Sequence, residues 1–152
     1  MSHTSLFYHI IFRTKYSEPT ISELNEQKLY AYISGIIKNK KSILYIIGGK
    51  SDHIHILVSI PPNIAISDFM KVLKTETSKW IKESGYFPKF LGWGSGYAVF
   101  SCSYEEKDEI INYIKNQKEH HRKVEFAEEI RTIFNKNNVK LNEKYFERDW
   151  IL

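Results

Sequence analysis

Two histidines stand one residue apart in the segment DHIHILV, residues 52–58, within a run of isoleucine, leucine and valine. Side chains alternate across a strand, so His53 and His55 share one face while the aliphatic side chains at 54, 56 and 58 share the other. Two neutral imidazoles within ~7 Å of each other on one strand can bind a single divalent metal ion. Two solvated or hydrogen-bonded histidines on a half-exposed face would show the same spacing, so the pattern alone leaves both interpretations open.

A second candidate segment, INYIKNQKEHHRK at 111–123, has the pattern of an amphipathic helix. Tyr113 and Gln117 are one turn apart and share a face, while isoleucines at 110, 111 and 114 form the flank that anchors the helix. The ordinary alternative is a core tyrosine followed by a surface glutamine. Neither this segment nor the histidine pair identifies a function alone.

Taken together, the two segments resemble the HUH single-tyrosine transposases of the insertion-sequence 200/605 type. The resemblance covers nearly the whole chain, because four segments are similar to the family's opening strand, metal motif, entry to the last strand, and catalytic helix with its sequel. In that order they are YHIIFRTKY (8–16), SDHIHILVSIPP (51–62), WGSGYAVFSCS (93–103) and YIKNQKEHHRKVEFAEEIRTIF (113–134). Gly94 departs from the pattern, since relatives commonly have glutamine after the tryptophan, and this puts one DNA contact in doubt.

The resemblance implies cleavage and rejoining of single-stranded DNA through a 5′-phosphotyrosine intermediate. It implies that Tyr113 is the nucleophile and that His53, His55 and Gln117 bind a divalent metal ion, Mg²⁺ or Mn²⁺. Such an ion draws charge off the scissile phosphate, and imidazole ligands lead us to expect Mn²⁺ to support activity at least as well as Mg²⁺. The covalent intermediate conserves bond energy, which fits the absence of a GxxxxGK phosphate loop. The sequence indicates no base for the tyrosine proton, whose ordinary pKa is about 10.

The same resemblance implies the partners. The family acts on DNA hairpins near element ends as homodimers, so we expect a dimer with active sites shared between subunits, the polar segment 101–107 allowing the exchange. Basic side chains that could neutralise DNA phosphates are Arg13, Lys15, Lys71, Lys74 and Lys115. Aromatic residues at 86, 87, 90, 93 and 97 could stack extruded bases.

The elements that must position these residues can be read from hydrophobic periodicity and turn signals. Strands are predicted at 5–16, 42–50, 53–60 and 97–103, with Gly48-Gly49 as the hairpin connection between the second and third. Helices are predicted at 21–41, 66–84 and 105–121, the second capped by Ser67 and stopped by Gly85. A further helix around 126–134 lies within a C-terminal segment at 125–152.

The order β-α-β-β-α-β predicts an α+β fold, a ferredoxin-like βαββαβ sandwich with a four-stranded antiparallel sheet plus additional C-terminal helices. We expect the first and third strands to be parallel neighbours at its centre. Two helices should cover one face, leaving the other face open or covered by the chain after the fourth strand.

Composition limits the alternatives. At 152 residues we expect a single domain, 1–152, and 42% hydrophobic residues exclude a disordered chain. A net charge of +4 permits a polyanionic partner, and Cys102, the only cysteine, excludes a disulfide within the chain and a cysteine-based zinc cluster. Without an apolar run of ~18 residues or a signal peptide, we expect no membrane contact and a cytoplasmic location in a bacterium or archaeon.

Three alternatives stay open at this point. A non-catalytic single-stranded nucleic-acid-binding protein of ferredoxin-like fold would form no covalent adduct with DNA, although aromatic strand motifs of the RNA-recognition type are absent. An HUH nickase of the replication-initiator or conjugative type usually has further domains and often two tyrosines. A domesticated HUH nickase that acts on host repeats would differ from a mobile-element enzyme only in its flanking DNA.

Overall fold

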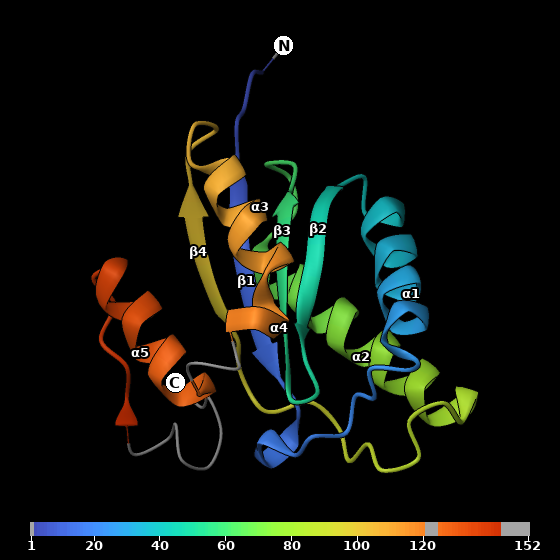
Figure 1. The fold of residues 1–152 in the computed structure, drawn as a ribbon. Coiled ribbons are helices and arrows are strands. Elements are labelled where there is room, and N and C mark those ends of the chain that lie inside the picture. The colour runs from blue at the N-terminus through green and yellow to red at the C-terminus, as the bar shows by residue number, and fades with distance from the viewer. Residues whose placement is uncertain (1, 121–124, 144–152) are drawn as a thin grey trace.

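The computed structural model describes residues 2–120 and 125–143, and Figure 1 shows their arrangement. A single sheet has the strand order β2-β3-β1-β4, with helices on both of its faces. This confirms the predicted α+β, ferredoxin-like fold. The elements along the chain are β1 (Phe7–Arg13), the 3₁₀ turn η1 (Lys15–Ser17), α1 (Glu26–Asn39), β2 (Ile43–Lys50), β3 (His53–Ser59), α2 (Ile66–Ser84), β4 (Ala98–Cys102), α3 (Lys107–Lys115), α4 (Gln117–His120) and α5 (Phe126–Lys136).

The two central strands, β1 and β3, are neighbours as predicted, but they run antiparallel. The prediction of a parallel pair is wrong because the α1 crossover makes β1 parallel to β2, and the short β2–β3 connection then reverses the chain. β3 is therefore inserted between β1 and β2 and is antiparallel to both. In this register Arg13 lies opposite His53, and Ile11 lies opposite His55.

The inner face of the sheet, defined here as the face that α1 and α2 cover, is apolar throughout. Helix α2 buries side chains at spacings of three and four residues, which places them in one stripe against the sheet. The stripe meets alternate side chains of the two central strands. The main participants are Ile10, Phe12, Ile54, Ile56, Val58, Phe69, Met70, Leu73 and Ile81.

The outer face, opposite the first, is covered by α3, α4 and α5, all of which come after the fourth strand (Figure 1). Its apolar cluster is small and joins Ile11, Ala98 and Phe100 of the sheet to α5. Phe126, Ile130 and Phe134 supply the α5 side of this cluster. The apolar cluster does not cover the rest of the outer face, where polar side chains can therefore lie.

The β2–β3 hairpin turns at Ser51-Asp52, so the prediction that Gly48-Gly49 forms the turn is wrong. Both glycines lie within β2, and Gly48 is opposite His55. A Cβ atom added at Gly48 would lie 2.5 Å from the carbonyl oxygen of Ile114. The missing side chain therefore lets the end of α3 approach the sheet directly beside His55.

Helix α2 has the predicted bounds, and Gly85 ends it in the left-handed conformation with φ of 76°. Ala65, and not Ser67, is the N-cap residue, because Ser67 already lies inside the first turn. The helix predicted at 105–121 is divided at Asn116 into α3 and α4. Residue 121 and the tail from 144 lie outside the described residues, within which no helix is both long and apolar enough to span a membrane.

Candidate functional site

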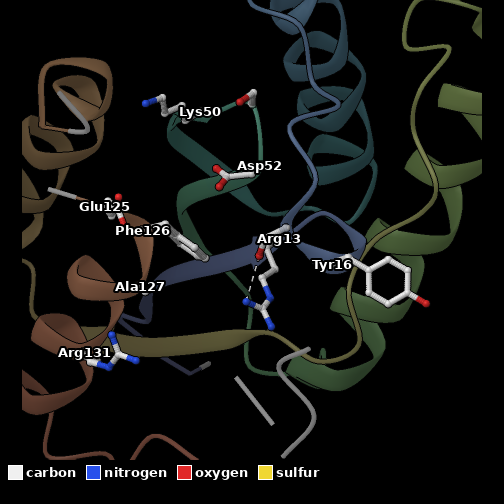
Figure 2. Close-up of a pocket in the computed structure, with 10 residues that line it drawn as sticks. Arg13, Tyr16, Lys50, Asp52, Glu125, Phe126, Ala127 and Arg131 are labelled. Carbon is white, nitrogen blue, oxygen red and sulfur yellow. Dashed lines mark hydrogen bonds between the residues drawn. The ribbon is translucent and has the colours of Figure 1, made fainter. Parts of the chain in front are cut away.

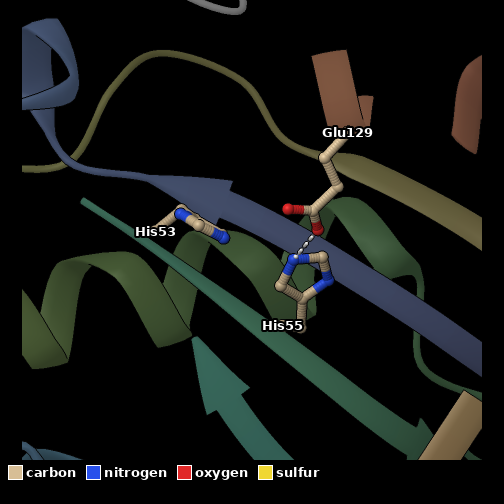
Figure 3. Close-up of side chains that lie close together, drawn as sticks. All are labelled: His53, His55 and Glu129. Carbon is tan, nitrogen blue, oxygen red and sulfur yellow. Dashed lines mark ion pairs between the residues drawn. The ribbon is translucent and has the colours of Figure 1, made fainter. Parts of the chain in front are cut away.

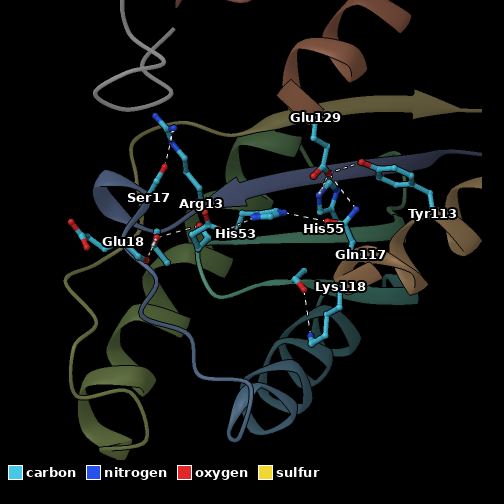
Figure 4. A network of polar contacts seen from close by, with 12 residues as sticks. Arg13, Ser17, Glu18, His53, His55, Tyr113, Gln117, Lys118 and Glu129 are labelled. Atoms are coloured by element: carbon cyan, nitrogen blue, oxygen red, sulfur yellow. Dashed lines mark hydrogen bonds and ion pairs between the residues drawn. The ribbon is translucent and has the colours of Figure 1, made fainter. Parts of the chain in front are cut away.

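The site lies on the outer face, where β3 presents His53 and His55 and the helices α3, α4 and α5 approach them (Figure 4). Both histidines are fully buried, as are the aliphatic side chains on the inner face of the same strand. Strand alternation thus places the two imidazoles as the sequence predicts. Their rings are 5.1 Å apart, centroid to centroid.

Both ring nitrogens of His53 have a polar neighbour. Its Nδ1 lies 2.6 Å from Oδ1 of Asp52, and its Nε2 lies 3.3 Å from Oε1 of Gln117. The ring of Phe126 stacks on it at a centroid distance of 4.0 Å. A carboxylate on Nδ1 fixes the tautomer in which that nitrogen carries the hydrogen, which leaves Nε2 as the nitrogen that could bind a metal ion.

His55 has a similar arrangement with different partners. Its Nδ1 lies 2.9 Å from Nε2 of His9, and its Nε2 lies 2.9 Å from Oε1 of Glu129. Burial, followed by the nearby His55, holds the pKa of His9 well below its usual range, so His9 is neutral. A neutral His9 can accept a hydrogen bond from Nδ1 of His55, and Nε2 of His55 then faces Glu129 as a potential metal ligand.

Tyr113 reaches the same carboxylate from α3. Its hydroxyl donates a hydrogen bond to Oε1 of Glu129 at 2.5 Å, and its ring lies edge-on to those of His9 and His55. Burial, together with the charge of Glu129 and this hydrogen bond, raises the pKa of the phenol well above its ordinary value. Tyr113 is thus a neutral hydrogen-bond donor here. Glu129, which accepts this hydrogen bond, lies where a base for the tyrosine proton would have to lie.

Gln117 lies one helical turn beyond Tyr113 and is almost fully buried. Its side-chain nitrogen donates to Oε1 of Glu129 at 3.2 Å, while its oxygen faces His53. Lys118, the next residue, binds Glu26 of α1 at 2.7 Å and ties α4 to the rest of the fold. The structure therefore brings all four residues predicted as nucleophile or metal ligand, Tyr113, His53, His55 and Gln117, into one network.

The donor set fits a divalent metal ion. Among the described residues, His53, His55 and Glu129 each offer one ligand atom, and these atoms all lie within 4.8 Å of one another (Figure 3). Two imidazole nitrogens and one carboxylate oxygen, with the amide oxygen of Gln117 beside them, form a mixed set that suits Mn²⁺ and related ions. The residues around the donors fit equally well, because Asp52 and His9 orient the two imidazoles.

Three residues of this network were not predicted from the sequence: Glu129, His9 and Asp52. Glu129 had a detectable signal, since it is a charged residue within the apolar stripe of α5 between Phe126, Ile130 and Phe134. His9 shares the outer face of β1 with Ile11, and the register of β1 and β3 then brings it beside His55. Asp52 adjoins His53 in sequence, but the turn that points it at Nδ1 is not where the two glycines predict it.

The predicted DNA contacts are distributed over several surfaces. Lys15, Lys71 and Lys115 are exposed, whereas Arg13 is buried beside His53 and donates to Oγ of Ser17. Lys74 donates to the carbonyl oxygens of residues 94 and 96 at 2.6 and 3.0 Å, which anchors the loop before β4 to α2. Lys74 thus has a structural role in this arrangement.

The aromatic residues of the loop at 86–97 also lie in different environments, some in the core and some at the surface. Phe87 and Phe90 belong to the inner core, and Trp93 donates a hydrogen bond from Nε1 to Oγ1 of Thr77. Tyr86 is 41% exposed, and Lys28 lies over its ring. The expectation that the whole group stacks bases is therefore wrong for the two core phenylalanines.

Comparison with known proteins places these observations in a family. The family described as "Transposase IS200 like" matches residues 2–117. The transposase for insertion sequence element IS200 of Salmonella typhimurium is 29% identical over 117 residues, which span 74% of this chain and 76% of the relative. The matched family segment ends at Gln117, so Glu129 and α5 lie beyond it.

Two solved structures have the same fold. A structure described as a transposase from Deinococcus radiodurans is 23% identical, with a TM-score of 0.60 over 77% of this chain and 95% of the other. A REP-associated tyrosine transposase bound to a REP hairpin is 13% identical, with a TM-score of 0.60 over 82% of this chain and 76% of the other.

Proposed function

We propose, from the premise that the chain belongs to the family of IS200-like transposases, that it cleaves and rejoins single-stranded DNA through a covalent bond between Tyr113 and a 5′-phosphate. The observation that carries this proposal is one network of contacts: the Tyr113 hydroxyl donates to Glu129, and the same carboxylate oxygen lies 2.9 Å from His55. The proposed nucleophile and the proposed metal ligands therefore belong to one network of contacts.

The proposed cofactor is Mg²⁺ or Mn²⁺, held by His53, His55, Glu129 and Gln117. Two oxygen donors beside two imidazoles make the set acceptable to both ions, which relieves the mismatch that imidazoles alone would present to Mg²⁺. When bound, such an ion withdraws charge from the scissile phosphate. The protein's own contribution is to fix the ligands before DNA arrives, because Asp52 and His9 already orient the two rings.

In the proposed reaction the Tyr113 oxygen forms a bond to phosphorus, and the bond from phosphorus to the 3′-oxygen breaks. The phenolic proton leaves toward Glu129, whose Oε1 already accepts the hydroxyl's hydrogen bond. The 3′-oxygen takes up a proton from water and leaves as a 3′-hydroxyl. The reverse step, attack of a 3′-hydroxyl on the phosphotyrosine, rejoins DNA without an added energy source.

The proposed substrate is a single-stranded DNA hairpin, in keeping with the hairpin in the REP-associated tyrosine transposase structure. A homodimer of single-domain subunits is part of the proposal. In place of the shared sites expected from the sequence, we propose an arrangement that acts in cis, because Tyr113 and His55 of the same chain converge through Glu129. Mixing a Tyr113→Phe subunit with a His55→Ala subunit tests this, since recovered cleavage would require Tyr113 of one subunit to act with His55 of the other.

The direct test of the activity uses labelled single-stranded oligonucleotides from the flanks of the gene, incubated with the purified chain and Mn²⁺. We expect a protein–DNA adduct that survives denaturation and a released strand that ends in a 3′-hydroxyl. The Tyr113→Phe variant should form no adduct. Tyr104→Phe is the matched control, because Tyr104 is 66% exposed and lies outside the network, and it should leave the adduct yield unchanged.

Two results would contradict the proposal. An adduct that persists in Tyr113→Phe would assign the nucleophile to another residue. Tight binding of the same oligonucleotides without any adduct, in either Mg²⁺ or Mn²⁺, would favour a non-catalytic single-stranded DNA-binding protein instead.

A further inference from the structure

A cavity of about 520 Å³ opens on the opposite side of the metal ligands from Tyr113. It lies between the end of β1 with η1, the β2–β3 turn and the beginning of α5 (Figure 2). Its volume is within the range of about 300–1,000 Å³ that is usual for small-ligand sites. Residues that line it are Arg13, Tyr16, Ser17, Lys50, Ser51, Asp52, Glu125, Phe126, Ala127 and Arg131.

The position of this cavity, here called the Arg13 cavity, is set by the register of the central strands. Arg13 lies opposite His53 at one end of β1, and His9 lies beside Tyr113 four residues away along the strand. Four residues of extended strand span about 13 Å. Figure 4 shows the same order, with Arg13 and Tyr113 at opposite ends of the network and the two metal-ligand histidines between them.

A second cavity of about 390 Å³ lies on the Tyr113 side and is acidic. Four glutamates and one lysine line it, namely Glu106, Glu109, Glu128, Glu129 and Lys136. The Arg13 cavity instead has three cationic side chains, of which Arg131 is paired with Glu143, and two carboxylates, of which Asp52 is bound to His53. The strand released from the scissile phosphate is itself polyanionic and is therefore favoured in the Arg13 cavity over the acidic cavity.

The mouth of the Arg13 cavity contains an unusual backbone. Tyr16 and Ser17 both have positive φ, 58° and 56°, which non-glycine residues seldom adopt. Tyr16 is 62% exposed, with Nζ of Lys15 5.4 Å from the centroid of its ring, while Oγ of Ser17 accepts a hydrogen bond from Arg13. An exposed aromatic ring near a buried guanidinium is suited to a base and its phosphate.

We propose that the Arg13 cavity binds the nucleotide that carries the leaving 3′-oxygen, with its base on Tyr16 and its phosphate near Arg13 and Lys50. The inference depends on the proposed function, because it starts from in-line displacement at phosphorus. In such a displacement the attacking and leaving oxygens lie on opposite sides of the phosphorus atom. With Tyr113 attacking from one end of the network, the leaving oxygen must point toward the Arg13 end.

The consequence is that the released strand stays bound until it is rejoined. The test uses the full chain with Mn²⁺ and an oligonucleotide from the gene's flanks labelled at both ends. The 3′ label tracks the adduct, and the 5′ label tracks the released strand. Because Tyr16 and Lys50 have exposed side chains, Tyr16→Ala and Lys50→Ala should fold normally, and the adduct that they form should lose the released strand about tenfold faster than the wild-type adduct does.

Lys136→Ala is the matched control, since Lys136 lines the Tyr113-side cavity, and it should leave strand release unchanged. Unchanged release from the adduct in both Tyr16→Ala and Lys50→Ala would overturn the inference and leave the proposed function intact. If the wild-type chain forms no adduct, the proposed function fails first. Binding of a fluorescent thymidine pentanucleotide then still decides the cavity's role, because binding equal in wild type and Tyr16→Ala would reject it.

Discussion

The two faces of the central strand β3 are equally buried but chemically opposite. On the inner face Ile54, Ile56 and Val58 pack against α1 and α2. On the outer face His53 and His55 have no exposed surface either, yet each of their ring nitrogens lies near a polar partner. Buried polar groups without partners destabilise a fold, so the outer face can be polar only because four segments of the chain supply partners to the two histidines.

The two faces of β3 thus have different roles. Apolar packing on the inner face stabilises the fold through area removed from water. The outer network contributes less net stability, since its hydrogen bonds replace bonds to water. Its residues are explained by the metal site proposed for this IS200-like transposase. Substitutions at adjacent positions of β3 should therefore have effects of different kinds.

The largest effect is expected for His55→Ala. Loss of one metal ligand should lower the rate of adduct formation roughly a thousandfold, because a bound ion supplies several kcal/mol of transition-state stabilisation. The measurement is the single-turnover rate with Mn²⁺, together with an unfolding curve that should remain cooperative. A variant that forms adduct at more than a tenth of the wild-type rate would remove His55 from the metal site.

Ile56→Ala, one residue further along β3, should behave in the opposite way. The side chain is fully buried in the inner core, so its truncation should lower the free energy of unfolding by about 2–5 kcal/mol. Adduct formation by the folded protein should stay within about threefold of wild type, because the inner face touches no reacting group. Denaturant unfolding and single-turnover kinetics at low temperature measure the two quantities. A loss of activity that exceeds the unfolded fraction would show that the faces are coupled.

A smaller effect is expected for His9→Ala, which removes the partner of Nδ1 of His55 but no proposed ligand. Loss of a residue that orients a metal-binding histidine usually lowers metal affinity by about 10–100-fold. Calorimetric titration with Mn²⁺ should show this reduction with one binding site retained. His3→Ala is the control, since His3 is exposed near the N-terminus. Unchanged affinity in His9→Ala would mean that His55 is oriented without it.

The smallest effect concerns pH. Burial holds the pKa of His9 well below its ordinary value of about 6.5, so below pH 6.5 the unfolded chain binds a proton that the folded protein does not. In metal-free protein the free energy of unfolding should therefore be highest above pH 6.5 and fall as the pH is lowered, by at most about 1.4 kcal/mol per pH unit. His9→Gln should flatten this slope and the exposed His3→Gln should not. An equal slope in wild type and His9→Gln would assign it to other groups.

Local geometry alone predicts which side chains of the site share a face, whereas the roles expected of them follow only from the resemblance to the family. Alternation along a strand determines that His53 and His55 share a face, and the helical turn determines that Tyr113 and Gln117 do. Each of these relations lies within one strand or helix, so it does not depend on how the elements pack against one another. The predicted bounds of α2 are right for a similar reason, because the apolar stripe and Gly85 are local signals.

The remaining features depend on how segments meet in space. Glu129 reaches the histidines only because α5 packs on the outer face through Phe126 and Ile130. The predicted turn is wrong because glycines are also used where helix and sheet approach closely, as Gly48 is beneath Ile114. The direction of the central pair requires the hairpin reversal to be combined with the crossover. Such relations have no local signal.

The most direct test of the central claim is a calorimetric titration of Mn²⁺ into the wild-type chain, the double variant His53→Ala/His55→Ala, and Glu129→Gln. If one outer-face site contains both histidines and Glu129, the wild type should bind one ion per chain, the double variant none, and Glu129→Gln should bind clearly more weakly. Equal binding in all three proteins, or no binding by the wild type, would contradict it.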